Sequence, residues 1–378
     1  EFAKSVESAV VHYGDITMTF LNNWFAADQR GNPLTYVSAV AVEEKSIIDY
    51  NRGDPDGVLS PGEVPRVPRV PLVAIYPEEG TLYSDSPFIV LDAEWVTPEQ
   101  KDAAALFGEF VQRPENQVKV LEYGFRPNNP SVPLAEPVSA EFGVDPNQPT
   151  AELEVPADDV LVRILDAWAD HRKEARVLLV LDISGSMGET AVADDERFAT
   201  KLDLAKEAAI SALGDFKGTD EVGLWVFTTD MFGDDPNYAE LVPVGPIREN
   251  RDEIADEIDG QFPLNGTPLY HVAGAAYEAM LESYDPAKIN AIVFLTDGVN
   301  DDGVPSDDER QFTDLIASLR SGSEGAQSRP VRLFTISYGD GADTVTLKAI
   351  SQATSAAHYD ASNPATINQV FTNVISNF

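Results

Sequence analysis

Hydroxyl and carboxylate side chains gather in three short segments of this chain. These segments are residues 182–188 (DISGSMG), 265–267 (NGT) and 296–298 (TDG). Two carboxylates and three hydroxyls stand out in them, without a nitrogen or sulfur ligand. Oxygen donors of this kind suit a hard cation such as Mg²⁺, which prefers octahedral oxygen coordination and keeps several waters. Glycine at 185 and 188 lets the backbone bend close to such an ion.

The elements around these segments predict an α/β fold with a doubly wound, mostly parallel sheet. From residue 158 onward, short runs of Val, Ile and Leu alternate with amphipathic stretches, which is typical of a parallel sheet covered by helices on both faces. Ligands of such sheets bind at the carboxyl ends of the strands, where two of the three segments lie. The expected strands are 177–181, 222–227, 291–295 and 331–336, and the expected helices are 158–172, 198–213, 268–282, 307–320, 344–353 and 365–376.

The order Asp-x-Ser-x-Ser, Thr and Asp resembles the metal-ion-dependent adhesion site of von Willebrand factor type A (vWA) domains, a Rossmann-like fold. The resemblance covers about residues 158–378. It implies that Ser184, Ser186 and Thr267 bind the ion through their hydroxyls, and that Asp182 and Asp297 act largely through bound water. The ion would be Mg²⁺, with Mn²⁺ or Ca²⁺ as alternatives, and one coordination position would stay open for an acidic side chain of a protein partner. Simple helix capping is the alternative for one segment alone, but three matching segments in the right order favour the metal.

The first 133 residues predict a smaller, mixed α/β domain. Strand-like runs lie at 8–13, 34–43 and 72–76. A helix is expected at 97–112, because Thr97 can cap it and an apolar stripe includes Leu106, Phe107 and Phe110. Residues 134–157 are rich in proline and predict an extended linker to the vWA domain.

This first part is similar to the C-terminal half of bacterial extracellular solute-binding proteins of the two-lobed, periplasmic type. The similar segments are 41–51 (AVEEKSIIDYN), 72–77 (LVAIYP), 80–81 (GT), 103–110 with Gln117, and 124–127 (GFRP). A complete two-lobed binder needs about twice this length. We therefore expect a partial domain, and the sequence names no solute-binding residue.

Composition excludes several classes of partner. The chain has 64 acidic and 26 basic residues, a formal net charge of -38. Such a surface repels phosphate backbones and anionic lipid, so we expect no nucleic-acid partner.

No apolar run approaches the ~20 residues of a membrane span. There is no cysteine, which excludes disulfides and thiolate metal sites. Because the chain begins at Glu1 without a signal peptide, we expect a processed fragment.

Three functions compete. The first is a bacterial extracellular or cell-surface protein that binds a protein partner through the Mg²⁺ site. The alternative is a solute receptor, in which the N-terminal lobe binds a small molecule and the vWA domain is accessory. The third, an enzyme, is not expected: Ser186 is not in a Gly-x-Ser-x-Gly elbow, and His271 is the one histidine near the site in sequence.

Two other acidic segments are weaker candidates for a cation site. Residues 301–309 could hold a second cation or shape the rim of the site, although a solvated loop with helix-capping acids is favoured. Asp54, Asp56, Gly57 and Glu63 follow a calcium-loop spacing. The first loop position would be Arg52, where a carboxylate is required, so we reject this site.

Overall fold

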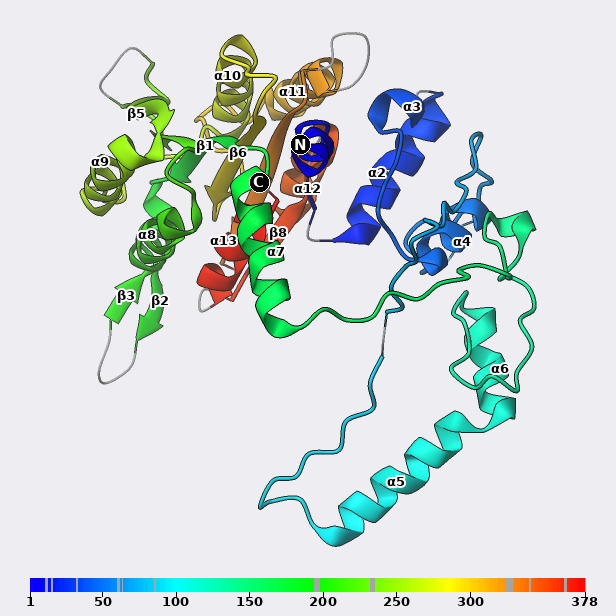
Figure 1. Cartoon of the computed structure of the whole chain (residues 1–378). Helices are drawn as coiled ribbons and strands as arrows, with labels where there is room; N and C mark the ends of the chain where they lie inside the picture. The colour runs from blue at the N-terminus through cyan, green and yellow to red at the C-terminus, as the bar shows by residue number, and fades with distance from the viewer. Residues whose placement is uncertain are drawn as a thin grey trace. The chain divides into compact units, whose positions relative to one another are not determined.

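The chain forms two compact units in a computed structural model (Figure 1). The structure describes residues 1–378 except 11–12, 15, 32, 60–61, 63, 85, 194–197, 232–234, 324–328, 340, 364–365 and 378. We call Glu1–Asp15 with Leu165–Phe378 the sheet unit, and Ile16–Ile164 the helical unit. These limits differ from the predicted boundaries at 133 and 158, because the first 15 residues belong with the sheet unit and the proline-rich segment belongs with the helical unit.

A six-stranded sheet forms the centre of the sheet unit, in the order β5-β4-β1-β6-β7-β8. All neighbours pair in parallel except β5, which runs antiparallel to β4 at one edge. The strands are β1 (Ala175–Asp182), β4 (Glu221–Phe227), β5 (Tyr238–Pro246), β6 (Ile289–Thr296), β7 (Val331–Tyr338) and β8 (His358–Ala361). The predicted fold class, a mostly parallel sheet with flanking helices, is confirmed.

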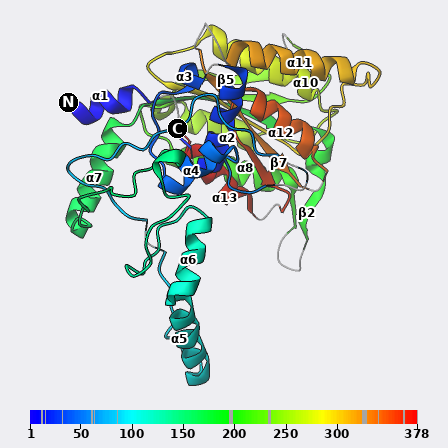
Figure 2. The same ribbon diagram turned by 90° about the vertical axis from the view of Figure 1, so that its right-hand side faces the viewer.

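Helices cover both faces of this sheet because its strands are apolar on both sides. Val177, Leu179 and Leu181 of β1 pack in one core with α8, α9 and α13. Leu178 and Val180 face the other core, with α10, α11 and α12. Figure 2 shows α10 and α11 side by side. The helices are α8 (Lys201–Ala212), α9 (Ile247–Asp259), α10 (Leu269–Glu282), α11 (Asp308–Ser323), α12 (Thr344–Ala353) and α13 (Ile367–Ile375).

Several elements of the sheet unit differ from the sequence prediction. The helix expected from 198 begins at Lys201, because 198–200 form β3 (Phe198–Thr200), which pairs with β2 (Thr190–Ala193) in a hairpin. Thr200 caps α8 in a capping box with Asp203. The strands β5 and β8 and the helix α9 were not predicted. Short 3-10 turns lie at η2 (Gly185–Gly188) and η3 (Leu213–Asp215), and α1 (Phe2–Ser8) opens the chain.

The described residues of the helical unit contain helices and turns but no strand ladder. A single bridge joins Thr81 and Glu152. The strands predicted at 34–43 and 72–76 are therefore wrong, and part of the run at 8–13 lies outside the described residues. The elements are α2 (Thr17–Arg30), α3 (Pro33–Tyr36), α4 (Glu44–Arg52), α5 (Pro98–Gln112), α6 (Pro114–Glu122), η1 (Ala140–Phe142) and the start of α7 (Asp158–His171). The helix predicted at 97–112 is confirmed as α5, with Thr97 as its cap.

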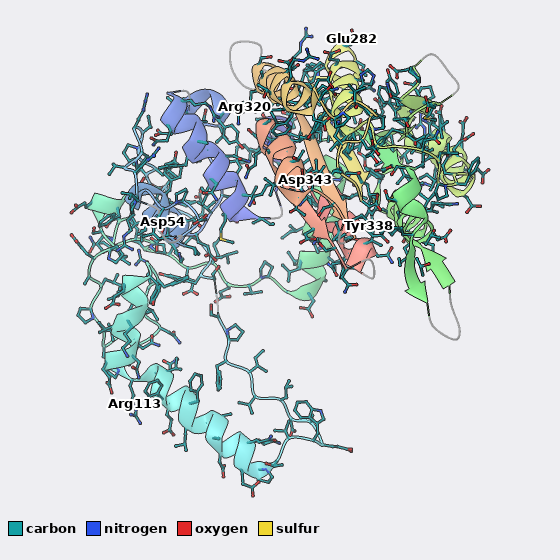
Figure 3. The ribbon with its side chains drawn as sticks, turned by 180° about the vertical axis from the view of Figure 1, so that it is seen from behind. Asp54, Arg113, Glu282, Arg320, Tyr338 and Asp343 are labelled. Atoms are coloured by element: carbon teal, nitrogen blue, oxygen red, sulfur yellow. The ribbon has the colours of Figure 1, made fainter. Side chains whose placement is uncertain are left out.

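Two small cores and a few polar contacts hold the helical unit together. Ile48 packs with Val138 and Val144, so the predicted linker contributes buried side chains. The Arg126 guanidinium binds the Glu44 carboxylate through Nε and Nη2, at 2.6 and 2.8 Å. Figure 3 labels Asp54 just beyond α4, and Arg113 between α5 and α6. Among the described residues, none of the helices is both long and apolar enough to cross a membrane.

Candidate metal centre

The turn after β1 carries the first predicted ligands. Asp182 is fully buried. Its Oδ1 accepts the Ser184 N–H at 2.7 Å, and its Oδ2 accepts the hydroxyl of Thr296 at the end of β6. Burial raises the pKa of Asp182 to about 7, although hydrogen bonds from Thr296 and Ser184 oppose the rise, and the negative charge of Asp297 adds to it.

A chain of hydroxyls links this turn to the turn after β6. The Oγ atoms of Ser184 and Ser186 lie 3.1 Å apart. Ser186 Oγ donates to Asp297 Oδ1 at 2.6 Å. Because β1 and β6 are parallel neighbours, their carboxyl ends share one edge of the sheet, and residues 111 positions apart in sequence come into contact.

The third segment is tied to both of the others. Thr267 and Asp301 exchange two backbone hydrogen bonds of 2.8 Å, and Gly185 N–H donates to the Asn265 carbonyl at 2.8 Å. A Cβ on Gly266 would lie 2.5 Å from the Asp301 carbonyl oxygen, so only glycine fits there. The Thr267 hydroxyl lies 3.1 Å from the position of a Cβ on Gly298, beside Asp297.

The structure therefore brings all five predicted site residues to one place. Asp182, Ser184, Thr267 and Asp297 are buried, and Ser186 is half-buried. Every functional atom of the set is an oxygen, and two of the side chains are carboxylates that lie near one another. This donor chemistry fits a hard divalent cation and does not fit a metal that prefers thiolate or imidazole ligands.

Two further residues join the site that the sequence did not single out. Lys201 Nζ lies 2.7 Å from Asp297 Oδ2 and 2.7 Å from Glu189 Oε2. Burial lowers the pKa of Lys201, but its hydrogen bonds to Asp297 and Glu189 outweigh that effect and raise it. The one signal in the sequence is a lysine at the first position of a capped helix, where a positive charge is disfavoured by the helix dipole.

An acidic cluster follows residues 296–298, the turn after β6. Carboxylate oxygens of Asp302, Asp307 and Asp308 lie within 4.8 Å of one another. Gln311 Nε2 donates to Asp302 and Asp307 at 2.8 and 2.9 Å, and Asn300 Nδ2 donates to Asp308 at 2.8 Å. These amides satisfy part of the cluster, which favours the interpretation as a hydrogen-bonded loop.

The geometry around Ser186 differs from that of a serine hydrolase. Ser186 donates its hydroxyl proton to Asp297. His271, on α10, instead lies with its Nε2 3.0 Å from Asp235 Oδ2. A histidine within hydrogen-bond reach is the usual activator of a serine nucleophile, and Ser186 lacks such a contact among the described residues.

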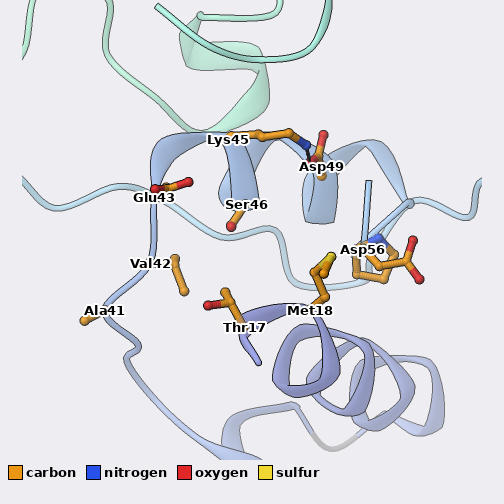
Figure 4. A pocket seen from close by; sticks show the side chains of 10 residues that line it. Thr17, Met18, Ala41, Val42, Glu43, Lys45, Ser46, Asp49 and Asp56 are labelled. Carbon is orange, nitrogen blue, oxygen red and sulfur yellow. Dashed lines mark hydrogen bonds and ion pairs between the residues drawn. The ribbon is translucent and has the colours of Figure 1, made fainter. Parts of the chain in front are cut away.

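The helical unit contains a hollow of about 530 Å³ (Figure 4). It lies between the start of α2, with Thr17 and Met18, and the segment that leads into α4. Lys45 and Asp49 form an ion pair on its wall. The residues that line it are Thr17, Met18, Ala41, Val42, Glu43, Lys45, Ser46, Asp49, Pro55 and Asp56. Six of these ten residues belong to the segment 41–51, one of those on which the predicted resemblance to solute-binding proteins rests.

Comparison with known families decides the identity of the sheet unit. The von Willebrand factor type A domain matches residues 177–373, more than half of the chain. The chain belongs to the vWA domain family. The match runs from within β1 to within α13 and contains the three turns described above.

Relatives of the vWA chain are distant. An uncharacterized protein of Mycobacterium tuberculosis, in the strains H37Rv and CDC 1551, is 24% identical over 283 residues, or 71% of this chain and 37% of the relative. The chain thus spans little more than a third of the length of the curated relatives it matches.

Several solved structures are similar to about half of this chain at low identity. A von Willebrand factor type A protein from Catenulispora acidiphila has a TM-score of 0.41 and 19% identity, over 54% of this chain and 43% of that one. The PilB minor pilin from Streptococcus sanguinis has a TM-score of 0.41 and 14% identity, over 54% and 61%. Proximal thread matrix protein 1 from the mussel byssus, solved with a zinc-occupied MIDAS motif, has a TM-score of 0.37 and 16% identity, over 53% and 47%.

Proposed function

We propose that this vWA chain is a bacterial extracellular or cell-surface protein that binds a protein partner through a Mg²⁺-dependent adhesion site. The observation that carries the proposal is the convergence of Asp182, Ser184, Ser186, Thr267 and Asp297 at one edge of the sheet. Mn²⁺ and Ca²⁺ are alternative ions, since the donors are oxygens. The proposal includes no enzymatic activity.

Each residue has a role in this proposal. The hydroxyls of Ser184, Ser186 and Thr267 would coordinate the ion, and the carboxylates of Asp182 and Asp297 would orient its water ligands. Thr296 holds Asp182 in place by a hydrogen bond. An ion bound there would supply the positive charge that attracts an external carboxylate. A ligand set rich in neutral hydroxyls leaves more of the ion's charge for that carboxylate than a set of directly bound carboxylates would.

The charge of this chain limits the partner. The acidic cluster of Asp302, Asp307 and Asp308 follows the Thr267–Asp301 bridge, and the whole chain carries a formal charge of -38. A partner that inserts an acidic side chain must offset this field with basic residues around it. We therefore propose a partner surface with one carboxylate ringed by Lys or Arg.

Titration of the full chain with Mg²⁺ or Mn²⁺ in a calorimeter tests the metal site. We expect saturable binding to the wild type and none to Asp182→Ala. Thr267→Val, which removes a hydroxyl and keeps the shape, should weaken binding by at least about tenfold. Asp92→Ala, which removes a carboxylate that is 94% exposed in the helical unit, is the control and should bind nearly as the wild type does. Equal binding by the wild type, Asp182→Ala and Thr267→Val would contradict the proposal.

A second candidate function is solute binding by the helical unit. The hollow beside α4 favours it, because its wall joins apolar groups with charged Glu43, Lys45 and Asp49. A thermal-shift screen of small polar solutes against the full chain tests it. A hit that persists in a chelator and is lost in Lys45→Ala would support a solute site, and a screen without such a hit would count against it.

A further inference from the structure

Lys201 is a positive charge built into the candidate metal centre. Its Nζ lies 2.7 Å from Asp297 Oδ2, and the side chains of Asp297 and Lys201 are 0% and 10% exposed. Lysine is rarely buried unless it is paired. Asp297 thus shares its two oxygens between Ser186, at 2.6 Å, and Lys201.

The fold makes room for this lysine. Gly339 follows β7 with φ +71°, and a Cβ there would lie 3.0 Å from Lys201 Cε and 3.5 Å from its Nζ. Any larger residue at 339 would therefore press on the end of the lysine that reaches Asp297. The Gly339 N–H is fixed by the Ala361 carbonyl at 3.1 Å, so the backbone wall beside the lysine is held in place.

The local helix does not explain a lysine at this position. Lys201 is the first residue of α8, where the dipole favours negative charge. The helix already has its capping box from Thr200 and Asp203. The Lys201 N–H donates to the Glu189 carbonyl at 2.9 Å, while its Nζ reaches the Glu189 carboxylate at 2.7 Å. Position 201 thus serves the site rather than the helix.

We propose that Lys201 is an internal counter-ion that competes with divalent cations for Asp297, stabilising the cation-free protein and lowering its metal affinity. This inference rests on the proposed metal site. The ammonium donates to the carboxylate oxygen that would otherwise be free to orient a metal-bound water. It also repels any cation held by the neighbouring hydroxyls. Glu189, whose side chain is 66% exposed, holds the ammonium from the solvent side.

The consequence is a weak and reversible metal site. A buried carboxylate pair without any cation is costly, and a chain that lacked Lys201 would need the metal in order to fold well. With Lys201 present, the protein keeps its structure in the absence of metal. Asp297 would help to hold the ion when one is bound, and the Lys201 ammonium would then keep Glu189 as its partner.

The test compares Lys201→Gln with the wild type as full-length chains, by calorimetric titration with Mn²⁺ and by thermal unfolding with and without EDTA. Glutamine keeps a donor and removes the charge. We expect Lys201→Gln to bind Mn²⁺ about tenfold more tightly and to unfold at a temperature about 3 °C or more lower in EDTA. Added Mn²⁺ should therefore raise its unfolding temperature more than that of the wild type.

A control variant separates the contact from a general change of charge, and a second variant tests the contact from its other side. Lys206→Gln removes a lysine of the same helix, whose Nζ donates to the carbonyls of Asp259 and Gln261 instead. It should leave Mn²⁺ affinity within about twofold of the wild type. Glu189→Gln leaves the ammonium with Asp297 alone and should weaken Mn²⁺ binding. This second variant also tests the inference if Lys201→Gln does not fold.

The outcomes separate the inference from the proposed function. If the wild type binds Mn²⁺ and folded Lys201→Gln binds it equally or more weakly, the counter-ion role is overturned and the metal site stands. If Lys201→Gln binds while the wild type does not, the counter-ion role is supported. If neither binds, both proposals are wrong. An unchanged affinity in Glu189→Gln would also overturn the inference.

Discussion

The sheet unit and the helical unit bury apolar side chains to very different degrees. Phe294 of β6 is 1% exposed, in the core between the sheet and helices α10, α11 and α12. Phe107 of α5, in the apolar stripe of an amphipathic helix, is 55% exposed, and α5 has no buried residue. Apolar side chains are thus packed in a core in one unit and left open in the other. A pattern specifies which side of a helix is apolar, whereas a neighbouring element is needed to cover that side.

The difference extends through the first part of the chain. Its extended segments expose Val73 and Ile75 at 72% and 87%, and Trp95 at 70%. In the sheet unit, all eight residues of β6 and of β7 are buried. We infer that the sheet unit is more stable than the helical unit. Four substitutions test this difference, in order from the largest expected effect to the smallest.

Phe294→Ala should give the largest loss. It removes a ring whose centroid lies 4.9 Å from that of Phe227. The two rings belong to a buried core whose closely packed side chains cannot move in to fill the cavity that the substitution leaves. We expect the free energy of unfolding of the sheet unit to fall by about 3–5 kcal/mol. Chemical denaturation measures this loss of free energy, with hydrogen exchange of the β1 and β6 amides as the probe of the sheet unit. A loss below about 1 kcal/mol would contradict a tightly packed sheet core.

Asp28→Ala should destabilise the helical unit alone. Asp28 is fully buried, and its two oxygens accept the N–H groups of Arg69 and Val70 at 2.6 and 2.8 Å. Removal leaves two donors without their acceptor, which costs about 1–3 kcal/mol. Faster hydrogen exchange should appear at 69–70 and not in β1. Asp92→Ala, which removes a carboxylate 94% exposed, is the control. Faster exchange in β1 as well would mean that the units unfold together.

His358→Gln should change the pH dependence of the sheet unit. Burial lowers the pKa of His358 below its ordinary 6.5. The unfolded chain therefore binds the proton more readily than the folded chain does. The stability that depends on a neutral, buried His358 is fully present above the unfolded-state pKa of 6.5, and it is lost as the pH falls to the lower, folded-state pKa. The wild type should lose more stability than the variant between about pH 7 and pH 5. Parallel pH profiles would contradict the assignment.

Phe107→Ala is the matched counterpart of Phe294→Ala and should have the smallest effect. Its ring contacts Phe88 and Phe110, with centroids 5.7 and 6.4 Å away, but more than half of it is exposed. We expect a change within about 0.5 kcal/mol. A loss comparable to that of Phe294→Ala would show that α5 is covered in solution, and the contrast between the two units would then be wrong.

The local sequence determined much of the sheet unit. The strands β1, β4, β6 and β7 were predicted within a few residues, because each is a continuous apolar run of the kind that parallel sheets bury on both faces. The order of the motifs along the chain predicted that the five candidate residues lie together at one edge of the sheet, and the structure brings them together there. These patterns repeat every few residues and need no knowledge of distant partners.

Tertiary structure decided the rest. The strand β5 has a single buried residue, Val242, and includes two prolines, Pro243 and Pro246, so only its pairing with β4 defines it as a strand. Val138 and Val144 became core residues of a segment that its prolines marked as a linker. Lys201 reads as an ordinary helix residue until β6 brings Asp297, 96 positions away, within 2.7 Å of its ammonium. The role of a charged side chain depends on its distance to the charges around it, and the local pattern of the sequence does not contain that distance.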